Sequence, residues 1–372
     1  MFTGIQVENF LSLRSVTIEL GKVNIFIGPN ASGKSNIAKI FRLLAKHARE
    51  GVPVLEGYAS PKDLSFNFDP SVNIYIGLEA PIGNRNCKYT LELFSGKYLE
   101  RVFVGNEVLI SYDGESNEVV IRGQHRMVYP FFPGDVVNYY GNRVFKSVLF
   151  ALPSDVEAEV RELASNLRRI SVHSFAPDAL RLKNSVTEQP FLKYHGENLA
   201  RYFLYLYTER RRDFGRIEET LRNMIPEVEE IIPHIEGADV EIWLKLKGLE
   251  EPLKPHNISD GTLRILAIIS ALYGGFSLVV LEEPENCIHP YLLESLMQLA
   301  RDSPSQIIMT THSPYLLDHA KAEEVYLVRK EDLETKVEKL TSTSEMEQVK
   351  RFLEEGGSLG EAWYSGIIGG AL

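Results

Sequence analysis

The chain is poor in cysteine and has no long apolar run, and both shortages limit the kind of protein it can be. Its two cysteines, Cys87 and Cys287, lie far apart and form neither a metal-binding nor a redox spacing. A reducing, cytoplasmic compartment is therefore expected. No apolar stretch approaches the ~20 residues that span a bilayer. Because the N-terminus also lacks a basic region followed by an apolar one, neither membrane insertion nor secretion is expected.

Repeats, low-complexity tracts and sustained heptads are also missing, so the sequence has no long coiled-coil arm. The net charge of −11 argues against a surface with non-specific affinity for DNA, although a local basic groove could exist on an acidic protein. With 372 residues, 44% hydrophobic and 24% charged, the composition fits a globular protein of one large domain or two ordinary ones.

Residues 28–35 form a complete G-x-x-x-x-G-K-[ST] phosphate-binding loop. An apolar run at 23–27 precedes the loop and a helical pattern over 36–47 follows it, as this loop requires. Lys34 should reach the β- and γ-phosphates, and Ser35 should offer its hydroxyl to Mg²⁺. A glycine-rich turn with an exposed lysine is the alternative, which the flanking strand and helix disfavour. The residues expected to hold a nucleotide here are Asn30, Ala31, Ser32, Gly33, Lys34 and Ser35.

A second apolar run, residues 277–281, ends in two adjacent carboxylates, Glu282 and Glu283. Ligands of open α/β sheets bind at the carboxyl ends of strands, so this strand is expected to end beside the phosphate loop. Glu282 would hold Mg²⁺ directly or through water, and Glu283 would orient or deprotonate the attacking water. A solvated acidic turn is the alternative for this segment alone, but a nucleotide site without a metal carboxylate would be incomplete.

Two shorter segments could complete the site. Residues 258–264 (ISDGTLR) open a helix that runs to about Tyr273, with Ser259 as its N-cap and Gly261 leaving room for close backbone approach. Residues 307–314 form an apolar strand that ends at His312, where the side chain could touch a γ-phosphate. Each segment also has a plain structural alternative. Residues 258–264 could be an ordinary helix start, and His312 could be a structural histidine with hydrogen-bond partners inside the fold.

The rest of the chain shows a change from strand to helix patterns. Short alternating runs separated by Gly, Asn and Asp predict antiparallel strands at 72–78, 89–94, 98–104, 107–112 and 118–121. An antiparallel pair at 5–7 and 16–20 is expected before them. From Ser154 the spacing of apolar residues becomes helical, a strand over 170–175 follows, and helices are expected near 197–210 and 214–224.

In their order and spacing, the phosphate loop, ISDGTLR, LVVLEEPE and TTHSP resemble ATPase heads of the ATP-binding-cassette (ABC) type, on the SMC/RecF/OLD side of that class. Residues 196–200 (GENLA) and 358–363 (SLGEAW) resemble segments of stand-alone ATPases in this group. The resemblance implies an α/β P-loop NTPase with a mixed central sheet flanked by helices, an antiparallel β-rich insertion and a helical lobe. It covers the two ends of the chain firmly and the middle loosely.

On this resemblance the chain is a single ABC-type ATPase domain over residues 1–372, with consecutive parts. These are a nucleotide-binding lobe at 1–70, the β-rich insertion at 71–150, the helical lobe at 151–250, a lobe with the signature, Walker B and switch histidine at 251–345, and a helical tail at 346–372.

The resemblance also implies a mechanism. Two heads would pack in opposition, with each ATP held between the phosphate loop of one head and Ser259, Asp260 and Gly261 of the other. Glu283 would be the general base, and His312 would be the switch histidine that senses the γ-phosphate. Hydrolysis would remove the phosphate that bridges the heads and let them part. The cofactors would then be ATP and Mg²⁺.

The sequence departs from the family pattern in four ways. Glu282 replaces the more usual Walker B aspartate, and no clear Q-loop glutamine is found, with Gln189 as the candidate. The long helical arms of SMC proteins are missing. So is the TOPRIM nuclease domain of OLD-type nucleases, so that a nuclease would have to come from another chain.

Three functions remain open. The first is an ATP-dependent homodimeric switch in DNA maintenance, repair or phage defence, with a separate effector chain. The second is the ATPase subunit of a membrane transporter, which the Glu-Glu-Pro-Glu-Asn and Ser-Asp-Gly runs disfavour. The third is a nucleotide-stabilised scaffold dimer with negligible turnover.

Candidate contacts to DNA are two basic clusters, but a solvated helix face balanced by Glu209, Glu218 and Glu219 is the favoured interpretation. The clusters are Arg161, Arg168 and Arg169, and Arg210, Arg211, Arg212 and Arg216.

Overall fold

The computed structural model describes residues 1–94, 97–113, 118–121, 136–139, 142–145, 147, 149–150, 152 and 156–370. The predicted helix start at Ser154 and the other residues between these ranges lie outside that description. The chain divides into two compact units. The first unit comprises Met1–Ile170, Ala322–Glu347 and Gly369–Leu372, and the second comprises Ser171–Lys321 and Gln348–Ile368.

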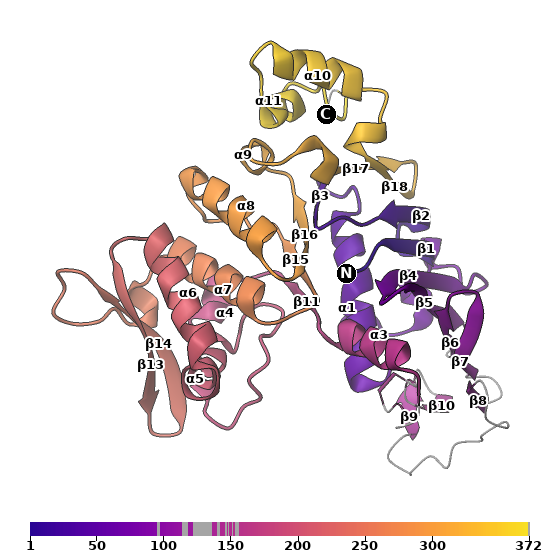
Figure 1. The fold of residues 1–372 in the computed structure, drawn as a ribbon, viewed down its shortest axis with the longest axis horizontal. Coiled ribbons are helices and arrows are strands. Elements are labelled where there is room, and N and C mark those ends of the chain that lie inside the picture. Colours follow the sequence, from indigo (N-terminus) through magenta and orange to yellow (C-terminus); the bar gives the residue numbers. More distant parts are fainter. Residues whose placement is uncertain are drawn as a thin grey trace. The chain divides into compact units, whose positions relative to one another are not determined.

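A seven-stranded antiparallel sheet dominates the first unit, in the order β2-β1-β4-β5-β6-β7-β8 (Figure 1). In β6 every second residue is buried, as expected of a strand with one covered face. The predicted N-terminal strand pair and the predicted β-rich region therefore form one continuous sheet. Its strands are β1 (Gly4–Phe10), β2 (Leu13–Glu19), β4 (Ile74–Ile82), β5 (Arg85–Phe94), β6 (Lys97–Val104), β7 (Glu107–Asp113) and β8 (Glu118–Ile121), and a separate hairpin pairs β9 (Val136–Tyr139) with β10 (Asn142–Phe145).

The phosphate loop of the first unit follows a second set of strands. The fully buried strand β3 (Val23–Ile27) pairs in parallel with β17 (Val325–Glu331), which pairs in antiparallel fashion with β18 (Glu334–Lys339). The helix α1 (Lys34–Glu50) begins directly after the loop, and α3 (Ala158–Arg168) packs against it and against the large sheet. Short helical turns complete the unit: α2 (Pro61–Leu64), η1 (Phe66–Phe68), η5 (Ala322–Glu324) and η6 (Leu340–Ser342).

The second unit is built on parallel strands and one buried helix. The strand β15 (Leu278–Glu282) pairs in parallel with β16 (Gln306–Thr311) and neighbours β11 (Ile170–His173). Nearly every residue of β15 and β16 is buried, which explains their continuous apolar runs. The helix α7 (Asp260–Tyr273) is apolar almost all round and is buried from Leu263 to Leu272.

A hairpin that sequence analysis does not anticipate lies in the second unit. It joins β13 (Val228–Glu236) to β14 (Asp239–Leu246), whose outer edge carries β12 (Asn184–Ser185). Helices α5 (Leu199–Glu209) and α6 (Arg211–Met224) pack on this hairpin (Figure 1). The predicted helices near 197–210 and 214–224 are thus confirmed. In β14 the buried residues Val240, Ile242 and Leu244 are apolar and stand at every second position, and this alternation is the sequence signal that could have revealed the strand.

The remaining elements are short. They are α4 (Pro177–Leu180), η3 (Pro255–Asn257), η4 (Pro290–Leu292), α8 (Leu293–Asp302), α9 (Pro314–Leu317), α10 (Met346–Glu354) and α11 (Leu359–Tyr364). Among the described residues, no helix has the length and apolar character needed to cross a membrane.

Candidate nucleotide site

The phosphate loop joins β3 to α1 through two residues in the left-handed region, Ala31 (φ 62°) and Gly33 (φ 107°). Gly33 is the N-cap of α1, and no side chain of the described residues caps this helix end. Successive backbone N–H groups in such a turn form a concave site for anions, to which the helix dipole adds.

Lys34 and Ser32 lie inside this loop. The Lys34 ammonium donates to the carbonyl oxygens of Gly28 at 2.7 Å and Pro29 at 2.8 Å, and its side chain is buried. The Ser32 hydroxyl is also buried, and it makes no hydrogen bond within the described part of the chain. A buried cation and an unpaired buried hydroxyl at a nest of N–H groups fit the phosphates of a nucleotide. Asn30, Ala31 and Ser35 are exposed.

The two loop glycines are needed for different reasons. A Cβ atom at Gly28 would overlap the backbone oxygen of Val328 on β17, whereas one at Gly33 would overlap the Thr335 side chain on β18. The Thr335 hydroxyl donates to the carbonyl oxygen of Ser32 at 2.8 Å and lies 2.6 Å from the Ser12 hydroxyl. Ser12 and Thr335 thus hold the backbone of the phosphate loop at the Ser32 carbonyl. Nothing in their sequence context predicts this role.

In the second unit, the expected base and the expected switch histidine lie together. Glu283 directly follows β15 in the left-handed region, with φ 46°, and its backbone N–H donates to the Thr310 carbonyl. Its Oε1 lies 3.4 Å from Nδ1 of His312, and its Oε2 accepts a hydrogen bond from Asn286 at 2.8 Å. Both Glu283 and His312 keep exposed side-chain surface, as groups that meet a substrate must.

Glu282, the expected metal ligand, ends β15 with a half-buried carboxylate. Its Oε1 accepts a hydrogen bond from the hydroxyl of Tyr194 at 2.5 Å. A carboxylate is a hard oxygen donor that suits Mg²⁺, which binds few protein groups and completes its shell with water and phosphate. Among the described residues, no cluster of three His, Cys, Asp or Glu side chains could hold a metal ion.

The signature segment, residues 258–264, packs against the turn that follows Glu283. Ser259 caps α7, where its hydroxyl accepts the backbone N–H of Thr262 at 3.1 Å. A Cβ atom at Gly261 would overlap the carbonyl oxygen of Cys287, so glycine permits this close approach. The carboxylate of Asp260 pairs with Arg181 at 2.5 Å and is therefore already engaged within the unit.

The C-terminal SLGEAW segment caps and docks a helix. Ser358 and Glu361 form a capping box at the start of α11. The backbone N–H of Gly360 donates to Asp318 at 2.9 Å, and a Cβ atom there would overlap the Pro314 carbonyl. The segment thereby packs on α9, which begins at Pro314, the last residue of the Thr-Thr-His-Ser-Pro run.

Other candidates from the sequence find no such support. The Gln189 side chain is exposed, and its backbone oxygen accepts a bond from Asn198. The arginines of the two basic clusters mostly serve the fold. Arg168 donates to the carbonyls of Leu149 and Phe150, Arg210 pairs with Asp213, Arg211 stacks on Tyr207 and Phe214, and Arg216 lies over Tyr273. These contacts support the structural interpretation of both clusters.

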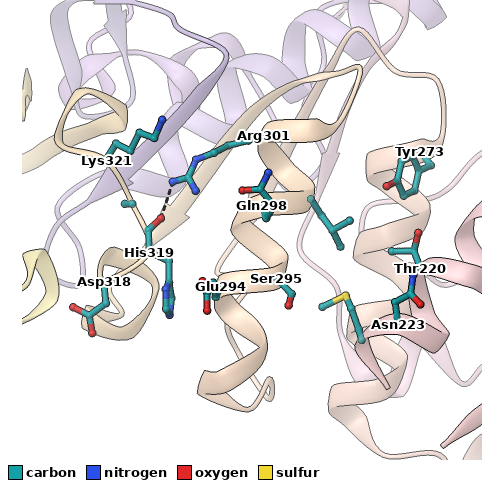
Figure 2. Close-up of a pocket in the computed structure, with 13 residues that line it drawn as sticks. Thr220, Asn223, Tyr273, Glu294, Ser295, Gln298, Arg301, Asp318, His319 and Lys321 are labelled. Atoms are coloured by element: carbon teal, nitrogen blue, oxygen red, sulfur yellow. Dashed lines mark hydrogen bonds between the residues drawn. The ribbon is translucent and has the colours of Figure 1, made fainter. Parts of the chain in front are cut away.

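A pocket of about 770 Å³ in the second unit is lined by none of the residues expected to bind nucleotide or metal (Figure 2). It is lined by α6, α8 and residues 318–321, and the Arg301 guanidinium donates to the His319 carbonyl at 2.6 Å. Its lining carries both acidic groups, Glu294 and Asp318, and basic groups, Arg301 and Lys321. Such mixed charge favours no single class of ligand.

The sequence matches two family models of AAA and ATPase domains. Residues 149–318 match a family model described as "AAA domain, putative AbiEii toxin, Type IV TA system", and residues 1–94 match one described as "AAA ATPase domain". An OLD nuclease from Thermus scotoductus is 24% identical over 363 residues, covering 89% of this chain and 62% of that protein. The chain thus spans less than two thirds of this relative's length.

Solved structures of SMC heads share the fold. The SMC head bound to the C-winged helix domain of ScpA is 14% identical with a TM-score of 0.56, covering 90% of this chain and 96% of that one. An SMC head with an extended coiled coil, bound to the C-terminal domain of ScpA derived from Pyrococcus furiosus, is 14% identical with a TM-score of 0.55, covering 95% and 98%. Taken with the phosphate loop, the acidic strand end and the α/β fold, these matches support an ABC-like ATPase of the SMC/RecF/OLD type.

Proposed function

We propose that the protein binds ATP with Mg²⁺, hydrolyses it, and pairs with a second copy around ATP as a molecular switch. The observation that carries this proposal is the phosphate loop, where the buried Lys34 ammonium and the unpaired Ser32 hydroxyl lie inside a nest of backbone N–H groups. No ordinary structural need explains this arrangement, because leaving a buried hydroxyl unpaired costs stability.

Each residue then has a defined task. Lys34 and the backbone of residues 30–35 bind the β- and γ-phosphates. Ser35 and Glu282 would each offer an oxygen ligand to Mg²⁺, which would neutralise phosphate charge. Glu283 takes the proton of the attacking water. Asn286 and His312 hold the two carboxylate oxygens of Glu283, which supports a fixed orientation of the base.

Pairing of two copies is proposed through the signature segment. Ser259 and Asp260 are exposed at the start of α7, where a helix dipole favours an anion such as the γ-phosphate of a partner's ATP. The SMC heads of similar fold were solved in complex with ScpA, and the OLD relative is named a nuclease. By analogy, we propose a separate effector chain and a role in DNA repair or phage defence.

The experiment is the solution mass of a Glu283→Gln variant, measured by light scattering with and without ATP and Mg²⁺. Without the base, ATP should persist and the mass should double. The matched control is the same variant with Lys34→Ala, which should stay at the smaller mass because ATP is not bound. If ATP does not change the mass of either variant, the proposed switch is wrong. If ATP still increases the mass of the double variant with Lys34→Ala, the proposed role of the phosphate loop is wrong.

A further inference from the structure

The hydroxyl of Tyr194 lies 2.5 Å from Oε1 of Glu282, although the two residues are 88 positions apart in the sequence. A tyrosine phenol is protonated at neutral pH, so it donates this bond to the carboxylate. Its donation occupies one carboxylate oxygen and fixes the rotation of the group. The second oxygen, Oε2, accepts no hydrogen bond from any residue that the structure describes and remains for another ligand.

The backbone around Tyr194 is tied to the segment after β11. The Tyr194 carbonyl accepts the N–H of Ser174 at 2.9 Å, and the His195 carbonyl accepts that of Ala176 at 3.2 Å. The His195 ring returns a bond to the Ser174 carbonyl at 2.9 Å. These hydrogen bonds therefore fix the backbone on which Tyr194 is carried.

The GENLA segment, which the proposed mechanism leaves without a task, secures the same stretch from its other end. Asn198 is fully buried, accepts the backbone N–H of Lys193 at 2.9 Å and donates to the carbonyl of Phe191 at 2.5 Å. Gly196 has φ 81°, and a Cβ atom there would overlap the Leu180 side chain. Both residue types are thus required to hold the turn that carries Tyr194.

We propose that Tyr194 is a positioning residue for the metal-binding carboxylate, held in place by the turn of residues 193–198. This inference rests on the proposed function, since it assumes that Glu282 binds Mg²⁺. Hydrogen bonds from outer groups orient metal ligands, and their loss typically weakens metal binding by about 10- to 100-fold. In this chain Tyr194, and not the exposed Gln189, is the residue of this stretch that reaches the expected metal site.

The test uses Tyr194→Phe, which keeps the ring and removes only the hydroxyl. Mn²⁺ serves as the probe, and its binding to the full chain with a non-hydrolysable ATP analogue is measured by electron paramagnetic resonance. We expect the Mn²⁺ dissociation constant to rise about tenfold, while binding of the analogue in EDTA stays unchanged. Tyr207→Phe is the control, since Tyr207 is an exposed tyrosine of the same unit, and it should change neither value.

A double-mutant cycle shows whether Tyr194 acts through Glu282. In a Glu282→Gln background the Tyr194→Phe change should have no further effect on Mn²⁺ binding. Unchanged Mn²⁺ affinity in Tyr194→Phe, or equal losses in both backgrounds, would overturn the inference while leaving ATP binding intact. Failure of the unaltered protein to bind the analogue at all would instead overturn the proposed function.

Discussion

The guanidinium of Arg264 donates to the backbone carbonyl of Glu283 at 2.8 Å. Its second terminal nitrogen donates to the carbonyl of Phe175, and the side chain is buried. Arg264 belongs to the signature segment, so one side chain connects that segment to the turn that carries the expected base. A residue such as Glu283 with positive φ stores about 1–3 kcal/mol of strain, which its surroundings must hold.

Replacing Arg264 should therefore impair catalysis more than ATP binding. Arg264→Lys keeps the charge but cannot hold both carbonyls in the same geometry. We expect kcat for ATP hydrolysis to fall by about tenfold or more, with little change in KM, because the base loses its position while the phosphate loop is unaltered. Steady-state phosphate release measures both values. A rise in KM at constant kcat would show that Arg264 acts on nucleotide binding instead.

Thr335→Val should weaken ATP binding from a position outside the phosphate loop. The change removes the bonds to the Ser32 carbonyl and the Ser12 hydroxyl, at a cost of about 1–2 kcal/mol of unfolding free energy. Because these bonds hold the loop, ATP affinity should fall as well. Thr343→Val is the matched control, since Thr343 is also buried and its hydroxyl donates to the Leu340 carbonyl. Denaturant titration and fluorescent-nucleotide binding check the two effects, and equal loss of affinity in both variants would refute the specific role of Thr335.

Alanine at the loop glycines should separate backbone strain from steric overlap. Gly57 has φ 86° and nothing within 4 Å of an added Cβ atom, so Gly57→Ala should cost only about 1–2 kcal/mol of strain. Gly33→Ala adds overlap with Thr335 to a similar φ, and should cost more stability and also abolish ATP binding. Gly28→Ala, which overlaps Val328 without positive φ, should displace β17. Equal thermal stability of the Gly33→Ala and Gly57→Ala variants would contradict the steric argument.

The residues that sequence analysis finds and those it misses differ in the range of their contacts. The phosphate loop, the acidic strand end and the helix start at Ser259 are recognisable because each is a local pattern on one element. The partners Tyr194 and Thr335 are not, because they lie 88 and 303 positions from Glu282 and Ser32. Only the completed fold brings such residues together, so no spacing in the sequence reveals them. The alternation of buried residues is regular in β14 but absent from β13, so only one strand of this hairpin carries a recognisable strand pattern.

Glu285 should make stability fall as pH rises. Burial raises the pKa of its carboxyl, although the Thr311 hydroxyl donates to Oε1 and acts in the opposite direction. Because the folded protein holds this proton to a higher pH than the unfolded chain does, the contribution of Glu285 is fully present below about pH 4.3, the ordinary pKa of a glutamate. It is lost as pH rises from there through the folded pKa.

Glu285→Gln removes this titration but keeps an oxygen that can accept the Thr311 bond. The stability of Glu285→Gln relative to the unaltered protein should therefore increase as the pH rises from about 4.3 through the folded pKa of Glu285. Denaturant unfolding at several pH values measures this difference, and Glu294→Gln on the same unit supplies a control for the loss of one acidic side chain. A difference that is constant across this range, or that moves toward the unaltered protein as pH rises, would show that Glu285 is ionised in the folded state as readily as in the unfolded one.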